Sequence, residues 1–286
     1  MFEKLEFKKN VSLKKLTSFK IGGKCRFYFS PKDLIELKKI INECQKNKLQ
    51  YFILGNGTNV LADDSGFDGA IIHLKNFKYI KLKRYRNYCF VTVLAGVSLF
   101  EFNKFLLNNK ISGFEWSFGI PGSIGGAIRM NAGACDGQTC DNLIEIKYLT
   151  NGKLKTKKGF KGEYRKGFEE GIIISAKFKL KTGNALEIEE KMNNNFSLKK
   201  ISQPYDKPSA GSIFKRKNEL YPAKIIDELG LKGLRIGDAM ISKKHAGFII
   251  NMGAATSRDV INLIKLLKLI FKSNGYIFDE EIIYLK

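Results

Sequence analysis

Two glycine-rich segments could bring the backbone very close to a ligand. The shorter is Gly55-Asn56-Gly57-Thr58-Asn59, and the longer covers residues 115–134, where five glycines surround Pro121. Glycine permits the positive φ angles that turn backbone N–H groups toward a phosphate. The shorter segment alone is equally compatible with an ordinary tight turn. The longer one indicates a flat or phosphorylated ligand, because a Cβ at so many positions would intrude on it.

Metal and disulfide chemistry find little support in the sequence. Only two histidines are present, His73 and His245, and both are interpreted as hydrogen-bonded structural residues. The cysteines are odd in number and include no CxxC pair: they are Cys25, Cys44, Cys89, Cys135 and Cys140. We therefore predict reduced thiols, as in a cytosol, and no metal site.

The elements around the glycine segments predict an α+β chain. Residues 49–54 form a buried-strand pattern that runs into the first glycine segment, and turn residues and a second strand, 70–74, follow. Because no helix follows this segment, a Rossmann dinucleotide site is disfavoured. Further strands (89–95, 143–150 and 172–180) alternate with helical stretches such as residues 99–108.

Capping signals predict two more helices. Ser30 is expected to cap a helix that has Pro31 in its first position, with Leu34, Leu37, Ile41 and Cys44 on one face. Thr256 to Asp259 forms a capping box for a helix that extends to about residue 272. The polar stretch 184–200 is interpreted as a connector between domains.

Composition bounds the class of protein. The chain has 286 residues, 44% of them hydrophobic, which is enough for two or three modest domains or one large one. It shows neither a signal-peptide pattern nor a membrane-spanning apolar run, so a soluble, unexported protein is expected. The net charge of +22 raises nucleic acid as a partner, but the lysines are spread along the chain. A basic surface that attracts phosphorylated small molecules is the favoured interpretation.

Five motifs follow one another along the chain: they are residues 55–59, residues 119–126, Tyr164-Arg165, residues 208–215 (PSAGSIFK) and residues 243–248 (KKHAGF). They occur in the order seen in the UDP-N-acetylenolpyruvoylglucosamine reductase family, which the chain resembles over residues 17–281. The short region after Asn195 resembles the type II branch, which lacks an additional substrate-covering insertion. One departure is Gly167, where the family usually has serine.

This resemblance implies a fold and an activity. The fold would be the α+β, FAD-binding fold of the p-cresol methylhydroxylase and vanillyl-alcohol oxidase type. Residues 1–195 would bind FAD, in subdomains 1–66 and 67–195, and residues 196–286 would form an α+β substrate domain. The enzyme would be cytoplasmic and would use non-covalent FAD and NADPH to reduce UDP-N-acetylglucosamine enolpyruvate to UDP-N-acetylmuramate, in peptidoglycan precursor synthesis. No nucleic acid, membrane or obligate protein partner is expected.

The resemblance also implies site residues. Arg165, Ser212 and Glu281 match the family's catalytic positions, and Tyr164 and Lys215 are expected to bind substrate. The expected cofactor-binding residues come from the two glycine segments: Gly55, Asn56, Gly57, Thr58, Asn59, Gly119, Ile120, Pro121, Gly122, Ser123, Gly125, Gly126 and Ala127.

The implied reaction suits these residue types. Hydride delivered to the terminal carbon, C3, of the enolpyruvyl group pushes negative charge onto the adjacent carboxylate, and Arg165 offers a permanent, fork-shaped cation there. Ser212 could then donate a proton to C2. Glu281 would share a proton or orient its partners, although its neighbour Glu280 competes for that role.

Two other functions are compatible with parts of the pattern. A flavin oxidase of the same superfamily often carries a histidine or cysteine for covalent flavin attachment, and residues 119–126 contain neither. A polyanion-binding protein is suggested by charge alone, and salt-sensitive retention on nucleic acid without flavin would favour it.

Overall fold

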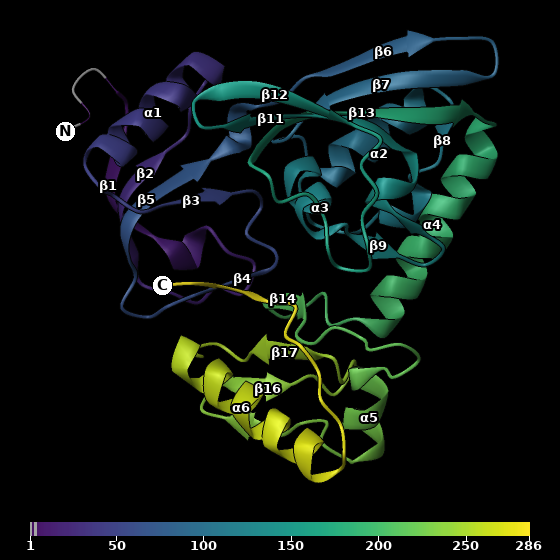
Figure 1. Cartoon of the computed structure of the whole chain (residues 1–286). Helices are drawn as coiled ribbons and strands as arrows, with labels where there is room; N and C mark the ends of the chain where they lie inside the picture. The colour runs from purple at the N-terminus through teal and green to yellow at the C-terminus, as the bar shows by residue number, and fades with distance from the viewer. Residues whose placement is uncertain (1, 3–4) are drawn as a thin grey trace. The chain divides into compact units, whose positions relative to one another are not determined.

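The computed structural model describes Phe2 and residues 5–286, which fall into two compact units. Unit 1 contains Phe29–Asn56 and Ile71–Lys199, with the described residues before Lys8, and unit 2 contains Lys8–Tyr28, Gly57–Ala70 and Lys200–Lys286. Figure 1 shows the course of the chain. Across the described residues, no helix combines the length and the apolar character needed to cross a bilayer.

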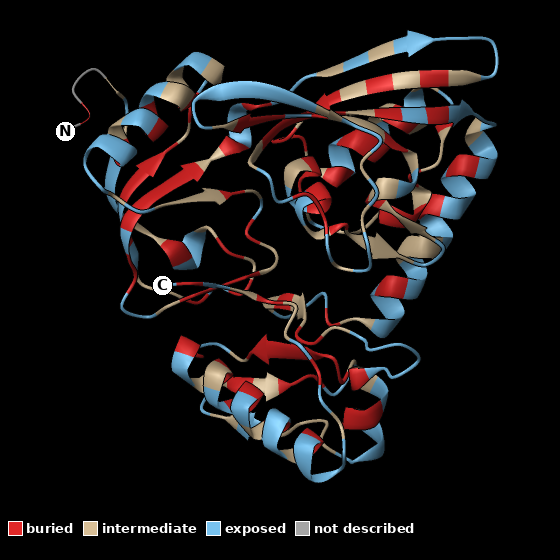
Figure 2. Cartoon of the chain, viewed as in Figure 1, coloured by how far each residue is buried: buried red, intermediate tan, exposed pale blue. Residues whose placement is uncertain are grey.

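A six-stranded antiparallel sheet organises unit 1. Its strand order is β12-β11-β13-β7-β6, and β8 pairs with β13. The strands are β6 (Ile80–Arg84), β7 (Tyr88–Leu94), β8 (Ile111–Ser112), β11 (Leu143–Thr150), β12 (Lys153–Lys158) and β13 (Ile172–Thr182). Every second residue of β7 is buried, as Figure 2 shows. This alternation identifies a sheet with one face on the core.

Helices α2 (Leu99–Asn108) and α3 (Ile124–Met130) cover the inner face of this sheet (Figure 1). Phe102 of α2 meets Phe114 edge to face at 5.0 Å, and Phe114 meets Phe178 of β13 at 4.9 Å. Strands β3 (Tyr51–Leu54), β9 (Gly133–Ala134) and β10 (Gly137–Gln138) and the end of β5 (Phe67–His73) also belong to unit 1. The aromatic core around Phe102, Phe114 and Phe178 packs beside the segment that follows α2.

Helix α1 (Leu34–Lys46) forms where capping signals predicted a helix, but it begins later. Asp33, rather than Ser30, is the cap, because its carboxylate accepts a hydrogen bond from the Glu36 N–H at 2.8 Å. Glu36 in turn accepts from the Lys32 N–H at 2.7 Å. The predicted apolar face is confirmed at Leu37, Ile41 and Cys44, which are all buried.

The stretch interpreted as a connector is helical. Helix α4 (Ala185–Ser202) is preceded by Asn184, whose side chain accepts a hydrogen bond from the Leu186 N–H at 2.9 Å. Ile188, Met192 and Lys199 are its buried residues. A mostly polar helix of this kind lacks the clear apolar stripe that sequence patterns detect.

Unit 2 has its own antiparallel sheet, in the order β14-β17-β16-β15, with helices packed on it. These elements are β14 (Ser209–Ser212), α5 (Pro222–Glu228), β15 (Arg235–Ile236), β16 (Ala239–Ile241), β17 (Phe248–Asn251) and α6 (Ser257–Ser273). The Thr256 and Asp259 capping box of α6 is confirmed, and the helix buries Val260, Ile264 and Phe271.

Two further strand pairings lie in unit 2. Strand β1 (Lys8–Ser12) pairs antiparallel with β2 (Lys24–Phe29), and β4 (Val60–Ala62) pairs parallel with β18 (Ile283–Leu285). The β4–β18 pair places the segment after the first glycine residues beside the end of the chain.

Candidate active site

The two glycine segments meet in unit 1. The Asn56 side-chain amide donates a hydrogen bond to the Pro121 carbonyl at 2.8 Å. A Cβ built on Gly55 would lie only 2.5 Å from Ser123 Oγ. Because real Cβ contacts are longer than that, any side chain at position 55 would force the Ser123 hydroxyl to move or the two segments to separate.

The second segment leads into helix α3, which the sequence analysis did not anticipate. Ser123 caps this helix by accepting a hydrogen bond from the Gly126 N–H at 3.3 Å. Gly125 donates its N–H to the Ala95 carbonyl at 2.9 Å, and a Cβ there would lie 3.0 Å from Ala95 Cβ. The Gly122 N–H meets no acceptor among the described residues. Packing therefore explains Gly125, whereas the Gly122 N–H remains available for a ligand.

Two other predicted cofactor ligands in this segment make internal contacts. The Ile120 N–H donates to the Ser117 carbonyl at 3.0 Å, and the Ala127 N–H donates to the Ser123 carbonyl at 2.8 Å. Ala127 is buried, so its side chain belongs to the core of unit 1.

The end of the first glycine segment belongs to unit 2, because the division falls after Asn56. Gly57 has a φ of +64°, and a Cβ there would lie 2.2 Å from the Leu16 carbonyl oxygen. Asn59 donates from its side chain to the Glu281 carbonyl at 2.9 Å, and it accepts from the Ile283 N–H at 2.9 Å. Gly57 and Asn59 thus have structural contacts within unit 2.

Arg165 lies in a tight turn of unit 1. Glu163 and Lys166 exchange two backbone hydrogen bonds of 3.1 Å, which close the turn around Tyr164 and Arg165. Arg165 has a φ of +53°, and its guanidinium donates to the Gly133 carbonyl at 3.1 Å. The same group lies over the Tyr164 ring, 5.2 Å from its centroid. These contacts position a partly buried cation close to the segment that follows α3.

Gly167 has a steric explanation. A Cβ there would lie 2.0 Å from the Ile128 carbonyl oxygen, at the C-terminal end of α3. The next residue, Phe168, donates its N–H to the same carbonyl at 3.1 Å, and Arg129 donates back to the Phe168 carbonyl at 3.1 Å. Glycine therefore lets the segment that follows Arg165 pack directly against α3.

Ser212 and Glu281 lie together in unit 2. Ser212, at the end of β14, pairs with Phe248 of β17. The next residue, Ile213, accepts a hydrogen bond from the Glu281 N–H at 2.7 Å, while Asn59 holds the Glu281 carbonyl. The backbone of Glu281 is therefore fixed on both sides, one residue away from the predicted proton donor.

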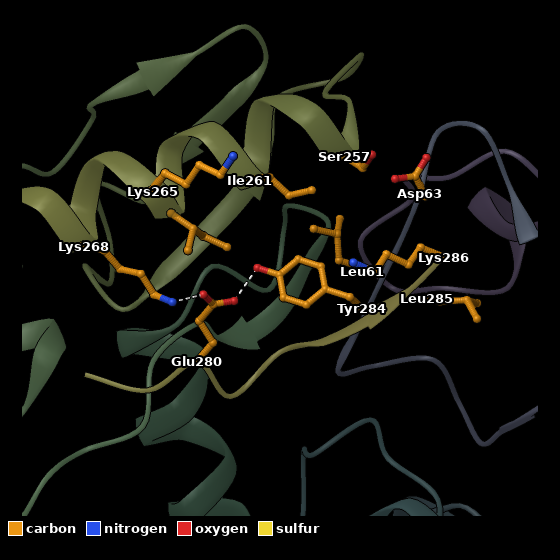
Figure 3. A pocket seen from close by; sticks show the side chains of 11 residues that line it. Leu61, Asp63, Ser257, Ile261, Lys265, Lys268, Glu280, Tyr284, Leu285 and Lys286 are labelled. Carbon is orange, nitrogen blue, oxygen red and sulfur yellow. Dashed lines mark hydrogen bonds and ion pairs between the residues drawn. The ribbon is translucent and has the colours of Figure 1, made fainter. Parts of the chain in front are cut away.

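The structure separates Glu281 from its neighbour Glu280. The Glu280 carboxylate forms an ion pair with Lys268 and accepts a hydrogen bond from the Tyr284 hydroxyl, as Figure 3 shows. Burial and this hydrogen bond raise the pKa of Tyr284. These three side chains line a cavity of about 400 Å³ in unit 2, and its lining includes neither Ser212 nor Glu281. Glu280 is thus engaged in contacts that Glu281 does not share.

His245 supports the strand that carries Ser212. Its Nδ1 accepts a hydrogen bond from the Gly247 N–H at 3.1 Å, and the Gly247 carbonyl accepts from Ile213 N–H at 3.0 Å. Burial lowers the pKa of His245, which favours the neutral ring that this contact needs. The expected hydrogen bonding of this histidine is confirmed. Lys215, which is predicted to bind substrate together with Tyr164, donates its backbone N–H to the Asp279 carbonyl at 2.8 Å.

A buried cation that no sequence signal indicated lies beside the second glycine segment. Lys199 of α4 donates hydrogen bonds to the carbonyls of Trp116 and Phe118. Nothing in its sequence context marks it, because it is one of many lysines in a polar stretch.

Family models and relatives agree with this architecture. A model described as the C-terminal domain of UDP-N-acetylenolpyruvoylglucosamine reductase matches residues 203–285, and one described as an FAD binding domain matches residues 25–156. A protein of Pseudothermotoga lettingae named UDP-N-acetylenolpyruvoylglucosamine reductase is 42% identical over 274 residues, which cover 92% of each chain. One of the same name from Prochlorococcus marinus is 38% identical over 285 residues, 97% of each chain.

Solved structures confirm the fold class. The crystal structure of UDP-N-acetylenolpyruvylglucosamine reductase from Thermus caldophilus matches 100% of both chains, with a TM-score of 0.82 and 31% identity. Cholesterol oxidase from Brevibacterium sterolicum matches 63% of this chain and 38% of its own, with a TM-score of 0.52 and 14% identity, which shows a shared fold alone. The predicted α+β, FAD-binding fold of the vanillyl-alcohol oxidase type is therefore confirmed.

Proposed function

The chain belongs to the family of UDP-N-acetylenolpyruvoylglucosamine reductases, and we propose that Arg165, Ser212 and Glu281 are its catalytic residues. It is an FAD-binding oxidoreductase that acts on a UDP-sugar, reducing UDP-N-acetylglucosamine enolpyruvate to UDP-N-acetylmuramate in peptidoglycan precursor synthesis. The proposal also includes NADPH as the reductant, non-covalent FAD and a cytoplasmic location. Residues 1–195 would bind FAD and residues 196–286 the UDP-sugar.

The glycine segments fit FAD. Its pyrophosphate needs backbone donors that no side chain shields, and the Gly122 N–H, without an acceptor among the described residues, is such a donor. A Cβ on Gly55 would lie only 2.5 Å from Ser123 Oγ, so the two segments approach each other closely at this point. This meeting of the two segments is the observation that carries the proposal.

When bound and reduced, FAD would supply a hydride for C3 of the enolpyruvyl group. The charge that then develops on the substrate carboxylate needs a fixed cation. Arg165 is suited to that role because its guanidinium is anchored on the Gly133 carbonyl and on the Tyr164 ring. An anchored cation stabilises the developing charge with little reorganisation. Tyr164 and Lys215 would contribute to substrate binding.

Ser212 is proposed to deliver the proton to C2. Its neighbours support this role, because Gly211 has a φ of +77° and no atom lies within 4 Å of a Cβ built there. The backbone immediately before Ser212 therefore borders open space. Glu281, held by Asn59 and by Ile213, is proposed to orient the proton donor or to share its proton.

The absorption spectrum of the purified protein tests the proposal. We expect bound FAD that denaturation releases intact, and anaerobic NADPH should bleach its visible band. Adding UDP-N-acetylglucosamine enolpyruvate should restore the band. A flavin that NADPH does not reduce, or that oxygen alone reoxidises while this substrate has no effect, would instead support an oxidase.

A further inference from the structure

A buried ammonium group lies directly behind the second glycine segment. Lys199 is only 5% exposed, and its Nζ donates to the Trp116 carbonyl at 2.5 Å and to the Phe118 carbonyl at 2.8 Å. Both carbonyls belong to residues 115–118, which we call the entry turn because Gly119 follows immediately. A side chain of α4 thus fixes the backbone at the start of the segment.

Burying this charge is unfavourable by itself. Burial lowers the pKa of Lys199, and the nearby Cys135 opposes that shift. A methionine would fill a similar volume without removing a charge from water. The two carbonyls explain the lysine, because a buried carbonyl that loses its donor is also destabilising. The Lys199 ammonium therefore serves as the hydrogen-bond donor for the two carbonyls of the entry turn.

Other contacts fix the same turn from a second helix. Asn103 of α2 donates to Ser117 Oγ at 2.6 Å, and Ser117 Oγ donates to the Phe114 carbonyl at 2.8 Å. The entry turn is therefore held by α2 through Ser117 and by α4 through Lys199.

Aromatic packing reinforces this arrangement. The Phe118 ring stacks on Phe100 of α2 at 5.9 Å, and it meets Phe196 of α4 edge to face at 5.7 Å. Gly119 follows with a φ of +86°. Side-chain contacts therefore hold the backbone as far as Phe118. The next residue is the first glycine of the segment, whose backbone adopts a positive φ.

We propose that Lys199 is a positioning residue for FAD: it holds the entry turn so that the backbone donors after Gly119 are already in place when the cofactor binds. A loop ordered in advance loses less conformational entropy on binding, and its affinity is correspondingly higher. This inference rests on the proposed function, in which the segment contacts FAD. Lys199 itself need not touch the cofactor.

The test compares FAD affinity in variants of two α4 lysines. Lys199→Met keeps most of the volume but removes the donors, and Lys191→Met is the matched control, because Lys191 is exposed on the same helix. FAD is removed from each purified protein, and its dissociation constant is measured from the quenching of flavin fluorescence. The melting temperature of each apoprotein is measured in parallel. We expect Lys199→Met to raise the dissociation constant at least tenfold and Lys191→Met to leave it within twofold.

A purely structural role for Lys199 gives a different result. The apoprotein would then melt earlier, while the FAD dissociation constant would stay within twofold of wild type, and that outcome overturns the inference. If Lys199→Met does not fold, Lys199→Gln, which keeps one amide donor, should still weaken FAD binding, and unchanged affinity in that variant is equally contradictory. Failure of the wild-type protein to bind FAD would refute the proposed function instead.

Discussion

Replacing Gly55 by alanine tests the meeting of the two glycine segments. The φ of Gly55 lies outside the left-handed region, so alanine is not strained by its own backbone. The new Cβ would lie 2.5 Å from Ser123 Oγ, and Ser123 is the cap of α3. The hydroxyl must therefore rotate away from the Gly126 N–H, or the segments must separate.

The structure sets the size of this effect. Losing a serine cap costs about 1 kcal/mol. If FAD binding requires this contact and the free apoprotein does without it, the whole cost appears as a roughly fivefold weaker FAD affinity. If the segments also separate, the hydrogen bond from Asn56 to the Pro121 carbonyl is lost, which adds about 1 kcal/mol. The FAD dissociation constant of Gly55→Ala should therefore rise by between about fivefold and about thirtyfold.

A double mutant separates this mechanism from general destabilisation. Ser123→Gly removes the hydroxyl that the new methyl group meets, and glycine is itself an acceptable cap. Gly55→Ala should then weaken FAD binding by no more than about twofold in the Ser123→Gly background, since the two effects are coupled. Equal losses in both backgrounds would refute the steric argument. Gly152→Ala is the control for general destabilisation. Its φ of +69° strains an alanine, but the new Cβ meets no atom within 4 Å, so FAD affinity should stay unchanged.

Three further predictions concern catalysis and stability. Arg165→Ala should lower kcat by about 10²- to 10³-fold, in line with about 3–4 kcal/mol for one lost electrostatic stabiliser, and a change in KM alone would make Arg165 a substrate anchor. Glu281→Gln should lower kcat, whereas Glu280→Gln should lower the melting temperature, through loss of the Lys268 ion pair, and leave kcat unchanged. Burial lowers the pKa of His73 to about 4, so its stabilising contribution is present above pH 6.5 and is lost as pH falls toward 4. That contribution is about 3 kcal/mol, and urea unfolding at pH 7 and pH 4.5 should show less acid sensitivity in His73→Gln.

Helices that are defined by their own capping residues and apolar periodicity could be predicted from the sequence. The helix at residues 257–273 was predicted because Thr256 and Asp259 form its capping box and its apolar residues recur on one face. Sequence periodicity did not indicate helix α4, because the polar residues Asn193 to Asn195 interrupt its apolar face and its buried residues include a lysine. Its stability comes from tertiary contacts, such as those of Lys199, that no periodicity encodes.

The candidate site could also be predicted only in part from the sequence. The identity of the glycine segments and of the catalytic candidates could be predicted from motifs and their order, but the cause of each glycine could not. Gly57 and Gly125 make close contacts with Leu16 and Ala95, and Gly167 makes one with Ile128. Such approaches depend on residues far apart in sequence, so a sequence shows the glycine and not the atom that demands it.

The most direct test of the central claim is an anaerobic stopped-flow experiment on Ser212→Ala. A proton donor is needed only after hydride has reached the substrate, so NADPH should bleach the flavin of this variant at the wild-type rate. Reoxidation of that flavin by UDP-N-acetylglucosamine enolpyruvate should become slow or stall, and solvent deuterium should enter C2 of the product correspondingly slowly. If Ser212→Ala instead blocks reduction by NADPH while substrate-driven reoxidation remains fast, Ser212 is a nicotinamide contact and its assignment as the proton donor is wrong.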